Sequence, residues 1–464
     1  MWNTIEFDHA LIRRYDQGGP RYTSYPTAAS FTGRFTATDY REAVQRSNDD
    51  LIPAPLSLYF HIPFCNTVCF YCGCNKIATK NYTLATGYLE TLYLEIALQG
   101  AIYDSDRKVE QLHWGGGTPT FLNRSDMQRL MQETRRHFNL RDDDGGDYSI
   151  EIDPRSVQPD DIQFLRELGF NRFSLGVQDL DEQVQIAVNR IQPIQQTRAI
   201  IDACRAADAR SINIDLIYGL PRQTLASFEQ TLDAIIRIQP DRLSVFNYAH
   251  LPALFKPQRR INAAELPDPE TKLALLKMII EKLTSAGYVY IGMDHFARPE
   301  DELAEAQRRG ELHRNFQGYS THGDCDIVAM GVSAISKVND VYSQNSKQLD
   351  SYSEGIQDGR FPVVRGIRLS EDDQIRRDLI QRLTCNFAID IPGFEAQWRG
   401  LSFADYFANE LASLSDLEED GLVRLSEHQL TVSAKGRLLV RSICMLFDAS
   451  LKNVDTSNRF SRVI

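Results

Sequence analysis

The amino-acid sequence predicts an α/β protein: a partial (β/α)6 TIM-like barrel of parallel strands with an N-terminal extension and a mainly helical, winged-helix-like C-terminal domain. Strand-like and helix-like patterns alternate six times between residues 56 and 249, which indicates parallel strands joined by crossover helices. Six units rather than eight suggest a barrel that is open on one side. The 464 residues exceed one ordinary domain. We expect domains over residues 1–55, 56–365 and 366–464.

Residues 1–55 precede the alternation and are rich in turn-forming and aromatic residues. The stretch from Gly18 to Thr27 has neither helical nor strand periodicity and contains a proline near each end, so we expect an irregular segment. Its two tyrosines and one arginine leave two interpretations open: a surface loop, which we favour, or part of a binding site.

The alternating region contains six strand-like runs, at residues 56–62, 109–115, 148–153, 171–178, 212–219 and 242–249. We expect these strands to be apolar on both sides, as in a sheet whose two faces are covered. Helical patterns separate them: Leu89, Leu92 and Ile96 share a face, as do Met127, Leu130, Met131 and Phe138, and further helices are expected over 160–168, 195–207 and 225–238. The carboxyl ends of such strands mark the working face.

The remainder of the chain changes in character. A helix is expected over residues 271–283 and a strand over 288–297. From about residue 366 the helices have charged faces, and two short strands around a turn at 421–436 precede a helix at 437–446. This order resembles a winged-helix unit, but the acidic chain favours a packing role over DNA binding.

Composition and charge exclude several functional classes. Hydrophobic residues make up 42% and charged residues 25% of the chain, as in soluble enzymes. The net charge of −12 argues against a general affinity for nucleic acid or anionic membranes. No apolar run approaches the roughly 20 residues that span a bilayer, and the charged N-terminus does not resemble a signal peptide. We therefore expect a cytoplasmic protein.

The eight cysteines are unevenly distributed. Four of them crowd together and four stand singly: Cys65, Cys69, Cys72 and Cys74, then Cys204, Cys325, Cys385 and Cys444. A crowded group in such a chain indicates metal binding rather than disulfides. Cys204 and Cys444 lie in apolar helical patterns, so we expect them to be buried and unreactive.

The crowded cysteines directly follow the first strand. Cys65, Cys69 and Cys72 have C-x3-C-x2-C spacing, and three thiolates on one loop can hold a four-iron cluster while leaving one iron without a protein ligand. The alternative is a structural zinc with Cys74 as the fourth ligand. Zinc sites usually consist of two separated cysteine pairs, so the cluster is favoured.

Further candidates lie at the ends of the later strands. His113-Trp114-Gly115-Gly116-Gly117-Thr118-Pro119 ends the second strand, and a glycine-rich turn lets a backbone approach a ligand closely. The other candidates on this face are Glu151, Gln178, Arg190, Asp215 and Ala249. A carboxylate such as Asp215 is costly to bury unless it is paired or binds a ligand. Each polar residue alone could belong to the core, but together at one face they favour a binding site.

The cysteine motif carries a resemblance to a known superfamily. With Tyr71 before the third cysteine, the run matches C-x3-C-x-aromatic-C and resembles the radical S-adenosylmethionine (SAM) enzymes. The resemblance implies that SAM binds the open iron of a [4Fe-4S] cluster and is cleaved to methionine and a 5′-deoxyadenosyl radical. The glycine motif is similar to the superfamily's GGE-type motif for the SAM amino group. Gly117-Thr118 replaces the Glu, so backbone groups would serve here.

A closer resemblance covers the chain from its N-terminal part to its last residues. The strings RYTSYPTA, LYFHIPFCNTVCFYCGCNK, QLHWGGGTPT, NIDLIYGLP, DRLSVFNYAHLP, GMDHFARP, RNFQGY and FSRVI are similar to the oxygen-independent coproporphyrinogen III dehydrogenases (decarboxylating). This family converts two propionates of coproporphyrinogen III to vinyl groups, giving protoporphyrinogen IX in heme biosynthesis. The resemblance implies a monomer with two bound SAM molecules, an unidentified reductant and an electron acceptor, and an N-terminal extension that contributes to the substrate site.

The resemblance also assigns roles to individual residues. Tyr59, Gly115, Glu151 and Ile335 would contact the SAM on the cluster; Tyr71, Gly116, Gly117, Gln178, Arg190, Asp215 and Ala249 would contact the second. Tyr59, Glu151 and Arg190 are the expected catalytic residues. Asp215 suits a ribose diol, because a carboxylate accepts two hydroxyl hydrogen bonds, and Arg190 suits a carboxylate.

Two alternatives are kept beside this function. One is a heme carrier that binds a cluster without turnover; its branch typically has Phe at the position of Cys74. The other is a zinc-stabilised regulatory protein. A tetracarboxylate substrate also needs cations, for which the candidates are Arg21, Lys76, Arg155 and Arg314, although each could be an ordinary surface charge.

Overall fold

The computed structural model describes residues 4–451. These divide into two compact units. The sheet unit comprises Phe31–Lys272 and Asp324–Arg368, and the helical unit comprises the other described residues. Compared with the domains expected from the sequence, residues 4–30 and 273–323 group with the described C-terminal residues. The sequence-based boundaries after residues 55 and 365 stay a prediction about folding domains.

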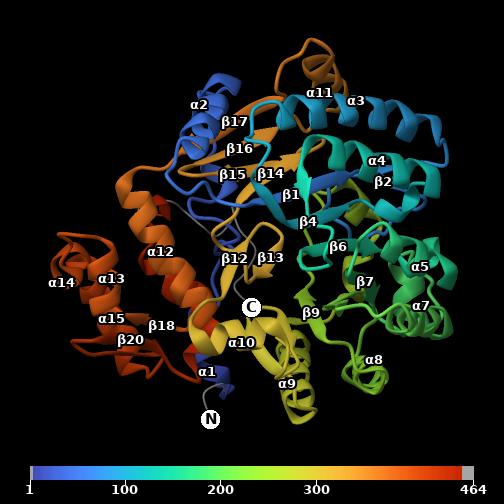
Figure 1. Cartoon of the computed structure of the whole chain (residues 1–464). Coiled ribbons are helices and arrows are strands. Elements are labelled where there is room, and N and C mark those ends of the chain that lie inside the picture. The colour runs from blue at the N-terminus through green and yellow to red at the C-terminus, as the bar shows by residue number, and fades with distance from the viewer. Residues whose placement is uncertain (1–3, 452–464) are drawn as a thin grey trace. The chain divides into compact units, whose positions relative to one another are not determined.

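A run of parallel strands forms the centre of the sheet unit (Figure 1). Their order is β9–β8–β7–β6–β4–β1–β14, so the six predicted strands are neighbours in chain order. The strands are β1 (Leu56–Ile62), β4 (Lys108–Gly116), β6 (Asp147–Ile152), β7 (Arg172–Gln178), β8 (Ser211–Tyr218), β9 (Arg242–Asn247) and β14 (Asp326–Met330). The predicted α/β class with parallel strands is thereby confirmed.

The sheet extends further than the sequence predicted. Beyond β1, the parallel strand β14 is followed by antiparallel strands. These are β15 (Ile335–Val338), β16 (Val341–Asn345) and β17 (Val363–Arg368), and β5 (Asn139–Leu140) pairs with β4. Strands β14 to β17 lie outside the alternating region of the sequence, and β5 has only two residues, so periodicity did not reveal them.

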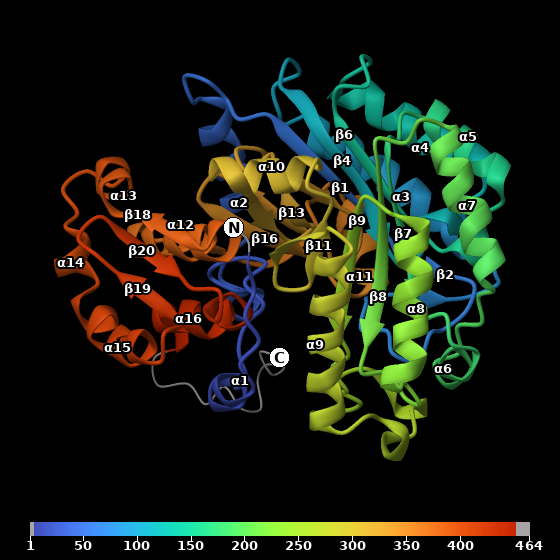
Figure 2. The same ribbon diagram turned by 90° about the horizontal axis from the view of Figure 1, so that it is seen from below.

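Helices flank the strands of the sheet unit, and those between β1 and β9 in the chain connect the parallel strands. They are α2 (Ala37–Asn48), α3 (Thr83–Gly100), α4 (Arg124–His137), α5 (Pro159–Glu167), α6 (Glu182–Ala187), α7 (Ile194–Ala206), α8 (Leu225–Ile238) and α11 (Leu349–Gln357). Figure 2 shows α4, α5 and α7 on the same side of the strands. Local signals begin these helices: the Asn123 side chain caps α4, and Thr224 with Ser227 forms a capping box at α8. Cys204 in α7 is fully buried, as predicted.

The prediction that the strands are apolar on both sides is wrong for β6, β7 and β8. Their residues alternate between fully and partly buried. Apart from Arg172 and Ser211 at the strand starts, the buried positions are apolar, such as Ile150 and Ile214. The partly buried ones include Glu151, Ser174 and Asp215. One face of these strands packs as a core, and the other is lined by polar groups that can bind a ligand.

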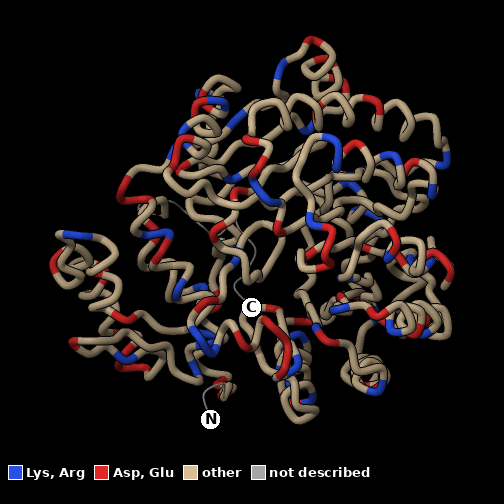
Figure 3. Tube along the Cα trace, viewed as in Figure 1, with Lys and Arg blue, Asp and Glu red and all other residues tan. Residues whose placement is uncertain are grey.

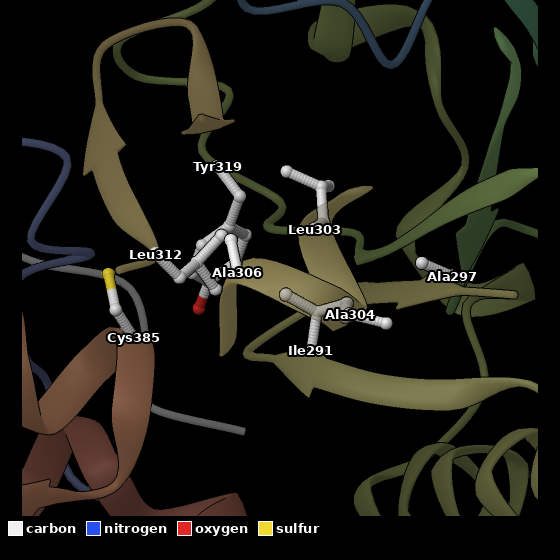
Figure 4. Packing of buried hydrophobic residues seen from close by; sticks show 8 residues of the cluster. All are labelled: Ile291, Ala297, Leu303, Ala304, Ala306, Leu312, Tyr319 and Cys385. Atoms are coloured by element: carbon white, nitrogen blue, oxygen red, sulfur yellow. The ribbon is translucent and has the colours of Figure 1, made fainter. Parts of the chain in front are cut away.

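The helical unit has its own core, shown in Figure 4. Its helices are α1 (His9–Tyr15), α9 (Pro269–Ser285, which begins in the sheet unit), α10 (Glu302–Arg309), α12 (Glu371–Asn386), α13 (Ile391–Gln397), α14 (Phe403–Tyr406), α15 (Ala408–Glu419) and α16 (Val440–Leu446). Ile291, Leu303, Leu312 and Cys385 bring four separate segments into this core.

Short strands complete the helical unit. The strand expected over 288–297 is instead a hairpin, β10 (Val289–Gly292) and β11 (His295–Ala297), because Gly292 and Met293 take positive φ angles and reverse the chain. Strands β12 (His313–Asn315) and β13 (Gly318–Ser320) form a second hairpin. The C-terminal hairpin is confirmed as β19 (Val423–Leu425) and β20 (Gln429–Val432), and β18 (Ala388–Asp390) adds an unpredicted third strand.

The irregular N-terminal segment is not a surface loop, which corrects the favoured interpretation. Tyr22 and Tyr25 are almost fully buried. The Tyr22 hydroxyl donates to a carboxylate oxygen of Asp448 at 3.0 Å, and the Tyr25 hydroxyl accepts the Ala449 backbone N–H at 3.2 Å. The two tyrosines thus hold the N-terminal segment against the C-terminal residues of the same unit. The final residues, including the FSRVI string, lie outside the described part.

Candidate active site

The cysteine motif lies on a loop that a short pair of strands closes. β2 (Phe64–Cys65) and β3 (Ile77–Ala78) are parallel neighbours directly after β1. The backbone N–H of Ile77 donates to the Pro63 carbonyl at 2.7 Å, and that of Thr79 to the Cys65 carbonyl at 2.9 Å. We call residues 65–76 the cluster loop. Its two ends are fixed at the carboxyl end of β1, which is where the working face was expected.

Hydrogen-bond donors surround the cysteine sulfurs. The Thr118 hydroxyl lies 3.4 Å from Cys65 Sγ, while Arg155 Nη2 and Arg190 Nη1 lie 3.6 and 3.5 Å from Cys69 Sγ. Such donors stabilise the negative charge of thiolate ligands. All eight cysteines are free of disulfides, as expected.

Cys74 lies beside the third cysteine of the motif. A hydrogen bond from the Cys74 thiol, assisted by the Lys76 ammonium, lowers the pKa of Cys72 to about 5. Cys72 therefore favours its thiolate form, the form that binds metal. Cys74 itself is exposed, and its pKa is raised well above the usual thiol value because the Cys72 sulfur accepts its hydrogen bond.

The spacing of the three sulfurs favours a cluster over a single ion. Zn–S bonds of about 2.3 Å around a tetrahedral ion place the sulfur atoms about 4 Å apart. The Sγ atoms of Cys65, Cys69 and Cys72 do not all lie within 4.8 Å of one another. An iron–sulfur cluster spreads its thiolates over different irons, so the wider arrangement fits it.

A row of polar side chains crosses the sheet next to this loop. Tyr59 on β1 is opposite His113 on β4, and His113 is opposite Ser149 on β6. The Tyr59 and His113 rings stack with centroids 5.7 Å apart. His113 Nδ1 lies 2.6 Å from the Ser149 hydroxyl and Nε2 lies 3.4 Å from Glu151 Oε1. The register of neighbouring parallel strands thus assembles Tyr59, His113 and Glu151 into one site.

Glu151 is held as an anion although burial opposes its charge. The hydrogen bond and charge of His113 and the backbone N–H of Gly116, 3.1 Å from Oε2, lower its pKa. The Glu151 side chain is still 44% exposed. Its carboxylate can therefore accept hydrogen bonds from His113 and Gly116 and also bind a cationic group of a ligand.

His61 completes this part of the site. Its Nε2 donates to the Asn75 carbonyl at 2.9 Å, which leaves Nδ1 to accept from the Tyr59 hydroxyl at 3.1 Å. Burial lowers the pKa of His61, so the ring is neutral. The ring therefore fixes the Tyr59 hydroxyl and joins it to the far end of the cluster loop.

The glycine motif leaves no room for side chains. A Cβ at Gly115 would lie 2.9 Å from His113 Nε2, and one at Gly116 would lie 2.7 Å from the His61 ring. At Gly117 it would meet backbone atoms of Pro63 at 2.6 Å. The glycines therefore let β4 pass directly against His61 and Pro63 at the entrance of the cluster loop. That their backbone also approaches a ligand stays a prediction.

A second group of site residues surrounds Arg190. Its Nη1 also donates to Asp153 Oδ2 at 3.1 Å, and its Nη2 to the Gly176 carbonyl. Arg190 Nε is buried and has no hydrogen-bond partner. A buried unpaired donor is unusual and suggests a ligand atom at this point. Tyr71 lies close enough for electrostatic interaction with the guanidinium.

Gln178 and Asp215 adjoin this second group. A Cβ at Gly176 would lie 2.9 Å from Gln178 Nε2 and 3.1 Å from Arg190 Nη2, so the missing side chain makes room for both. Gly176 is opposite Asp215 in the sheet. Burial, reinforced by the charge of Glu151, raises the pKa of Asp215 to about 6. Asn213 Nδ2 donates to Asp215 Oδ1 at 2.8 Å.

Ala249 and Ile335 lie outside the strand ends proper. Ala249 follows β9, next to Tyr248, which packs in a buried cluster with Val188 and against Tyr71. Ile335 begins β15, beside Ala334, which belongs to the buried cluster that Tyr59 contacts. Ala249 is therefore next in the chain to a residue that packs near Tyr71, and Ile335 is next to one that packs near Tyr59.

The four candidate cations have different surroundings. Lys76 Nζ donates to the Cys72 carbonyl at 3.2 Å, and Arg155 pairs with Asp153 at 2.7 Å. In the helical unit, Arg21 pairs with Asp294 at 3.3 Å, and the Arg314 guanidinium lies over the Tyr319 ring. Arg314 Nε and Nη1 are buried without a hydrogen-bond partner. Of the four candidate cations, Arg314 therefore has the most unused donors with which to bind an anion.

Comparison with known proteins identifies the family. Residues 59–235 match the radical SAM superfamily and residues 369–439 the HemN C-terminal domain. A Pseudomonas aeruginosa protein named oxygen-independent coproporphyrinogen III oxidase is 52% identical over 464 residues, the full length of both chains. This chain belongs to the oxygen-independent coproporphyrinogen III oxidase family. The Escherichia coli K12 member is 50% identical over 460 residues, 99% of each chain.

A solved structure of this family agrees. It is described as coproporphyrinogen III oxidase (HemN) from Escherichia coli, a radical SAM enzyme, and superposes with a TM-score of 0.92. The identity is 49%, over 97% of this chain and 100% of that one. The α/β radical SAM fold is thereby established, and the superfamily implies a [4Fe-4S] cluster and SAM. The donor-lined, widely spaced cysteines fit such a cluster.

Several residues of the site were not singled out from the sequence. His61 and Asp153 lie at strand ends, close in the chain to residues that the sequence analysis had singled out. Ser174 and Asn213 share the polar face of β7 and β8 with Asp215. The alternation of polar residues in NRFSLGVQ and INIDLIYG was a usable signal for Ser174 and Asn213. His61 could have been found as the second residue after Tyr59 on β1, because the two point to the same face.

Among the described residues, no helix is both long and apolar enough to cross a membrane.

Proposed function

We propose that this chain catalyses the oxygen-independent oxidative decarboxylation of coproporphyrinogen III. Two propionate side chains become vinyl groups, two CO2 are released, and the product is protoporphyrinogen IX, within heme biosynthesis. The observation that carries the proposal is the 52% identity over the whole length to a relative named for this substrate. The proposal is also supported by the cluster loop, whose cysteines can bind an iron–sulfur cluster, and by the polar strand ends, which can bind SAM.

We further propose that two SAM molecules bind. When bound, the cluster and SAM supply the oxidising radical that removes a β-hydrogen from a propionate. The first SAM would contact Tyr59, Gly115, Glu151 and Ile335; the second would contact Tyr71, Gly116, Gly117, Gln178, Arg190, Asp215 and Ala249. Two separate polar groups, one around Glu151 and one around Arg190, support two binding sites.

The proposed role of each charged residue follows from its contacts. Glu151, anionic and partly exposed, would accept hydrogen bonds from the amino group of the first SAM. Asp215, once ionised, would accept both hydroxyl groups of a ribose. Arg190 uses its Nη atoms within the chain, so its free Nε would donate to a carboxylate. The buried Tyr59–His61 pair would orient the first SAM rather than transfer a proton.

The remaining features are also part of the proposal. Residues 1–55 would contribute to the substrate site, and Arg314 would bind a substrate carboxylate through its unused donors. The substrate radical loses CO2 and passes one electron to an acceptor. We expect a monomer in the cytoplasm, reduced by a separate donor. The closure of the strands as a partial (β/α)6 barrel and the winged-helix character of the C-terminal domain are likewise proposed.

The function is tested by anaerobic turnover with coproporphyrinogen III, SAM and dithionite. We expect protoporphyrinogen IX, with two CO2 and two 5′-deoxyadenosine per product. Absence of product from a chain with an intact cluster would contradict the proposal and favour a carrier.

A pair of variants tests the assignment of the cysteines. Cys69→Ala should lose the cluster, measured by iron content and absorption near 400 nm, and should not cleave SAM. Cys204→Ala, altered in the buried core of α7, should retain both. Equal losses in the two variants would show that the cysteines are misassigned.

A further inference from the structure

Two segments of this acidic chain contain no acidic residues. The chain has 63 Asp and Glu and a net charge of −12, and Figure 3 shows both signs mixed along the trace. Residues 51–89 and 242–264 nevertheless contain neither Asp nor Glu. Their charged side chains, apart from histidine, are Lys76, Lys80, Arg242, Lys256, Arg259 and Arg260. The first segment contains the whole cluster loop.

The structure packs the second segment against the cluster loop. Gln258 lies in the short helix η4 (Lys256–Arg260) and is 2% exposed. Its Nε2 donates to the Tyr71 carbonyl at 2.9 Å, while its Oε1 accepts the Leu251 backbone N–H at 2.6 Å. A buried amide with both ends bonded fixes η4 to the loop directly before Cys72.

Two ring contacts extend this attachment. The Phe255 ring faces Gly73, where a Cβ would lie 3.2 Å from the ring. The Arg260 guanidinium lies 5.4 Å from the centroid of the Phe70 ring, a cation–π contact. Phe70 and Tyr71 also pack on the buried cluster that contains Ile261. Residues 254–260, which we call the basic segment, are therefore attached rigidly to the cluster loop.

The outer side of the basic segment faces solvent. Lys256, Arg259 and Arg260 are exposed, and Leu254 is 71% exposed. Arg259 donates to the Pro252 carbonyl at 3.0 Å. Within the described residues, these three cations form no ion pair with a carboxylate. An apolar residue among unpaired cations has the composition of a small interface for an acidic partner.

We propose that the basic segment, together with the exposed edge of the cluster loop at Gly73–Asn75, is the docking surface for a small acidic redox protein that reduces the cluster. This inference rests on the proposed function, which requires one electron for each SAM cleaved. One electron leaves the reduced cofactor of the partner and enters the cluster, and no bond or proton is exchanged. The overall charge would repel an acidic partner elsewhere, so the local cations direct it to this place.

The test uses the cluster-loaded chain and flavodoxin, an acidic flavin protein, as the probe. The docking variant K256E/R259E/R260E reverses the three cations. The control variant R34E/R136E/R360E makes the same change of charge at exposed positions elsewhere in the same unit. Iron content and absorption confirm that both variants retain the cluster. Flavodoxin binding is measured by calorimetry at low and at physiological salt. In a second assay, 5′-deoxyadenosine formation is measured with either flavodoxin or dithionite as the reductant.

We expect the docking variant to raise the Kd for flavodoxin about 30-fold or more and the control by about 3-fold or less, because only the docking variant places like charges in the interface. Binding to the unaltered chain should weaken with salt. SAM cleavage driven by flavodoxin should fall in the docking variant, whereas cleavage driven by dithionite should be unchanged.

Equal effects of the two variants, or binding that is insensitive to salt, would overturn the proposal. Binding of heparin in place of flavodoxin would also overturn it, in favour of a polyanion site. Failure of dithionite-driven decarboxylation in the unaltered chain would contradict the proposed function instead, and the measured Kd values would still decide the docking surface.

Discussion

At the scale of single residues, Asp215 on β8 should make ligand binding at the second group of site residues depend on pH. Its carboxyl is buried among hydroxyl and amide donors and has a pKa of about 6 without ligand. The ionised carboxylate can accept hydrogen bonds from both ribose hydroxyls, whereas the protonated form gives up one acceptor oxygen to its own proton. Binding at this site should therefore be stronger above a pH of about 6 than below it.

The number of bound SAM molecules tests this role. At pH 8 we expect two SAM per chain by anaerobic equilibrium dialysis. At pH 5.5 the second SAM should bind about fourfold more weakly, because about three quarters of the carboxyl is then protonated. Asp215→Asn should bind one SAM at both pH values. Asp202→Asn, on the exposed side of α7, should behave like the unaltered chain. Two SAM per chain in Asp215→Asn would contradict the assignment.

Most residues of the site could be predicted individually, but their partners could not. The spacing of Cys65, Cys69 and Cys72 was sufficient to propose a cluster, because thiolate chemistry depends on local sequence. The contact of Arg190 with Cys69 joins residues 121 apart in the chain. No periodicity or spacing encodes such a pair. It exists because two strand-end loops meet at one edge of a parallel sheet.

At the scale of elements, a buried carboxylate ties α3 to the strands beyond β1. Glu95 is fully buried and accepts hydrogen bonds from the Gly331 backbone N–H at 2.7 Å, from Asn345 Nδ2 at 2.8 Å and from the Tyr352 hydroxyl at 2.6 Å. Burial nevertheless raises its pKa to about 7. The stability of the contacts that join α3 to the β14–β15 turn, β16 and α11 should therefore depend on pH.

The direction of this coupling follows from proton linkage. Between about pH 4.5 and 7 the folded chain holds a proton on Glu95 that the unfolded chain has lost, so the free energy of unfolding decreases as pH rises. The total loss is about 3 kcal/mol. Glu95→Gln should remove this contribution, giving a smaller decrease of Tm between pH 5 and pH 8. Parallel Tm profiles for the variant and the unaltered chain would contradict the account.

Elements were predictable where one period dominated the sequence. The six parallel strands and the helices between them followed from the alternation of strand-like and helical patterns. The hairpin at β10–β11 did not, because the strand-like residues on both sides of Gly292 and Met293 concealed the positive φ angles of these two residues. Strands β14 to β17 were missed because their pairing with β1 and with one another depends on long-range register.

At the scale of the whole molecule, the strings that resemble the family lie in both units. Composition was informative at this level: the net charge of −12 and the crowded cysteines favoured a metal-binding enzyme over a nucleic-acid-binding protein. The N-terminal segment was misjudged, because burial of Tyr22 and Tyr25 depends on residues more than 400 positions away.

The central claim is that a SAM-derived radical removes hydrogen from a propionate of coproporphyrinogen III. The most direct measurement uses substrate deuterated at the propionate β-carbons, turned over anaerobically with SAM and a reductant. We predict that deuterium appears in 5′-deoxyadenosine, one atom for each vinyl group formed. Formation of protoporphyrinogen IX with 5′-deoxyadenosine free of deuterium would contradict the claim.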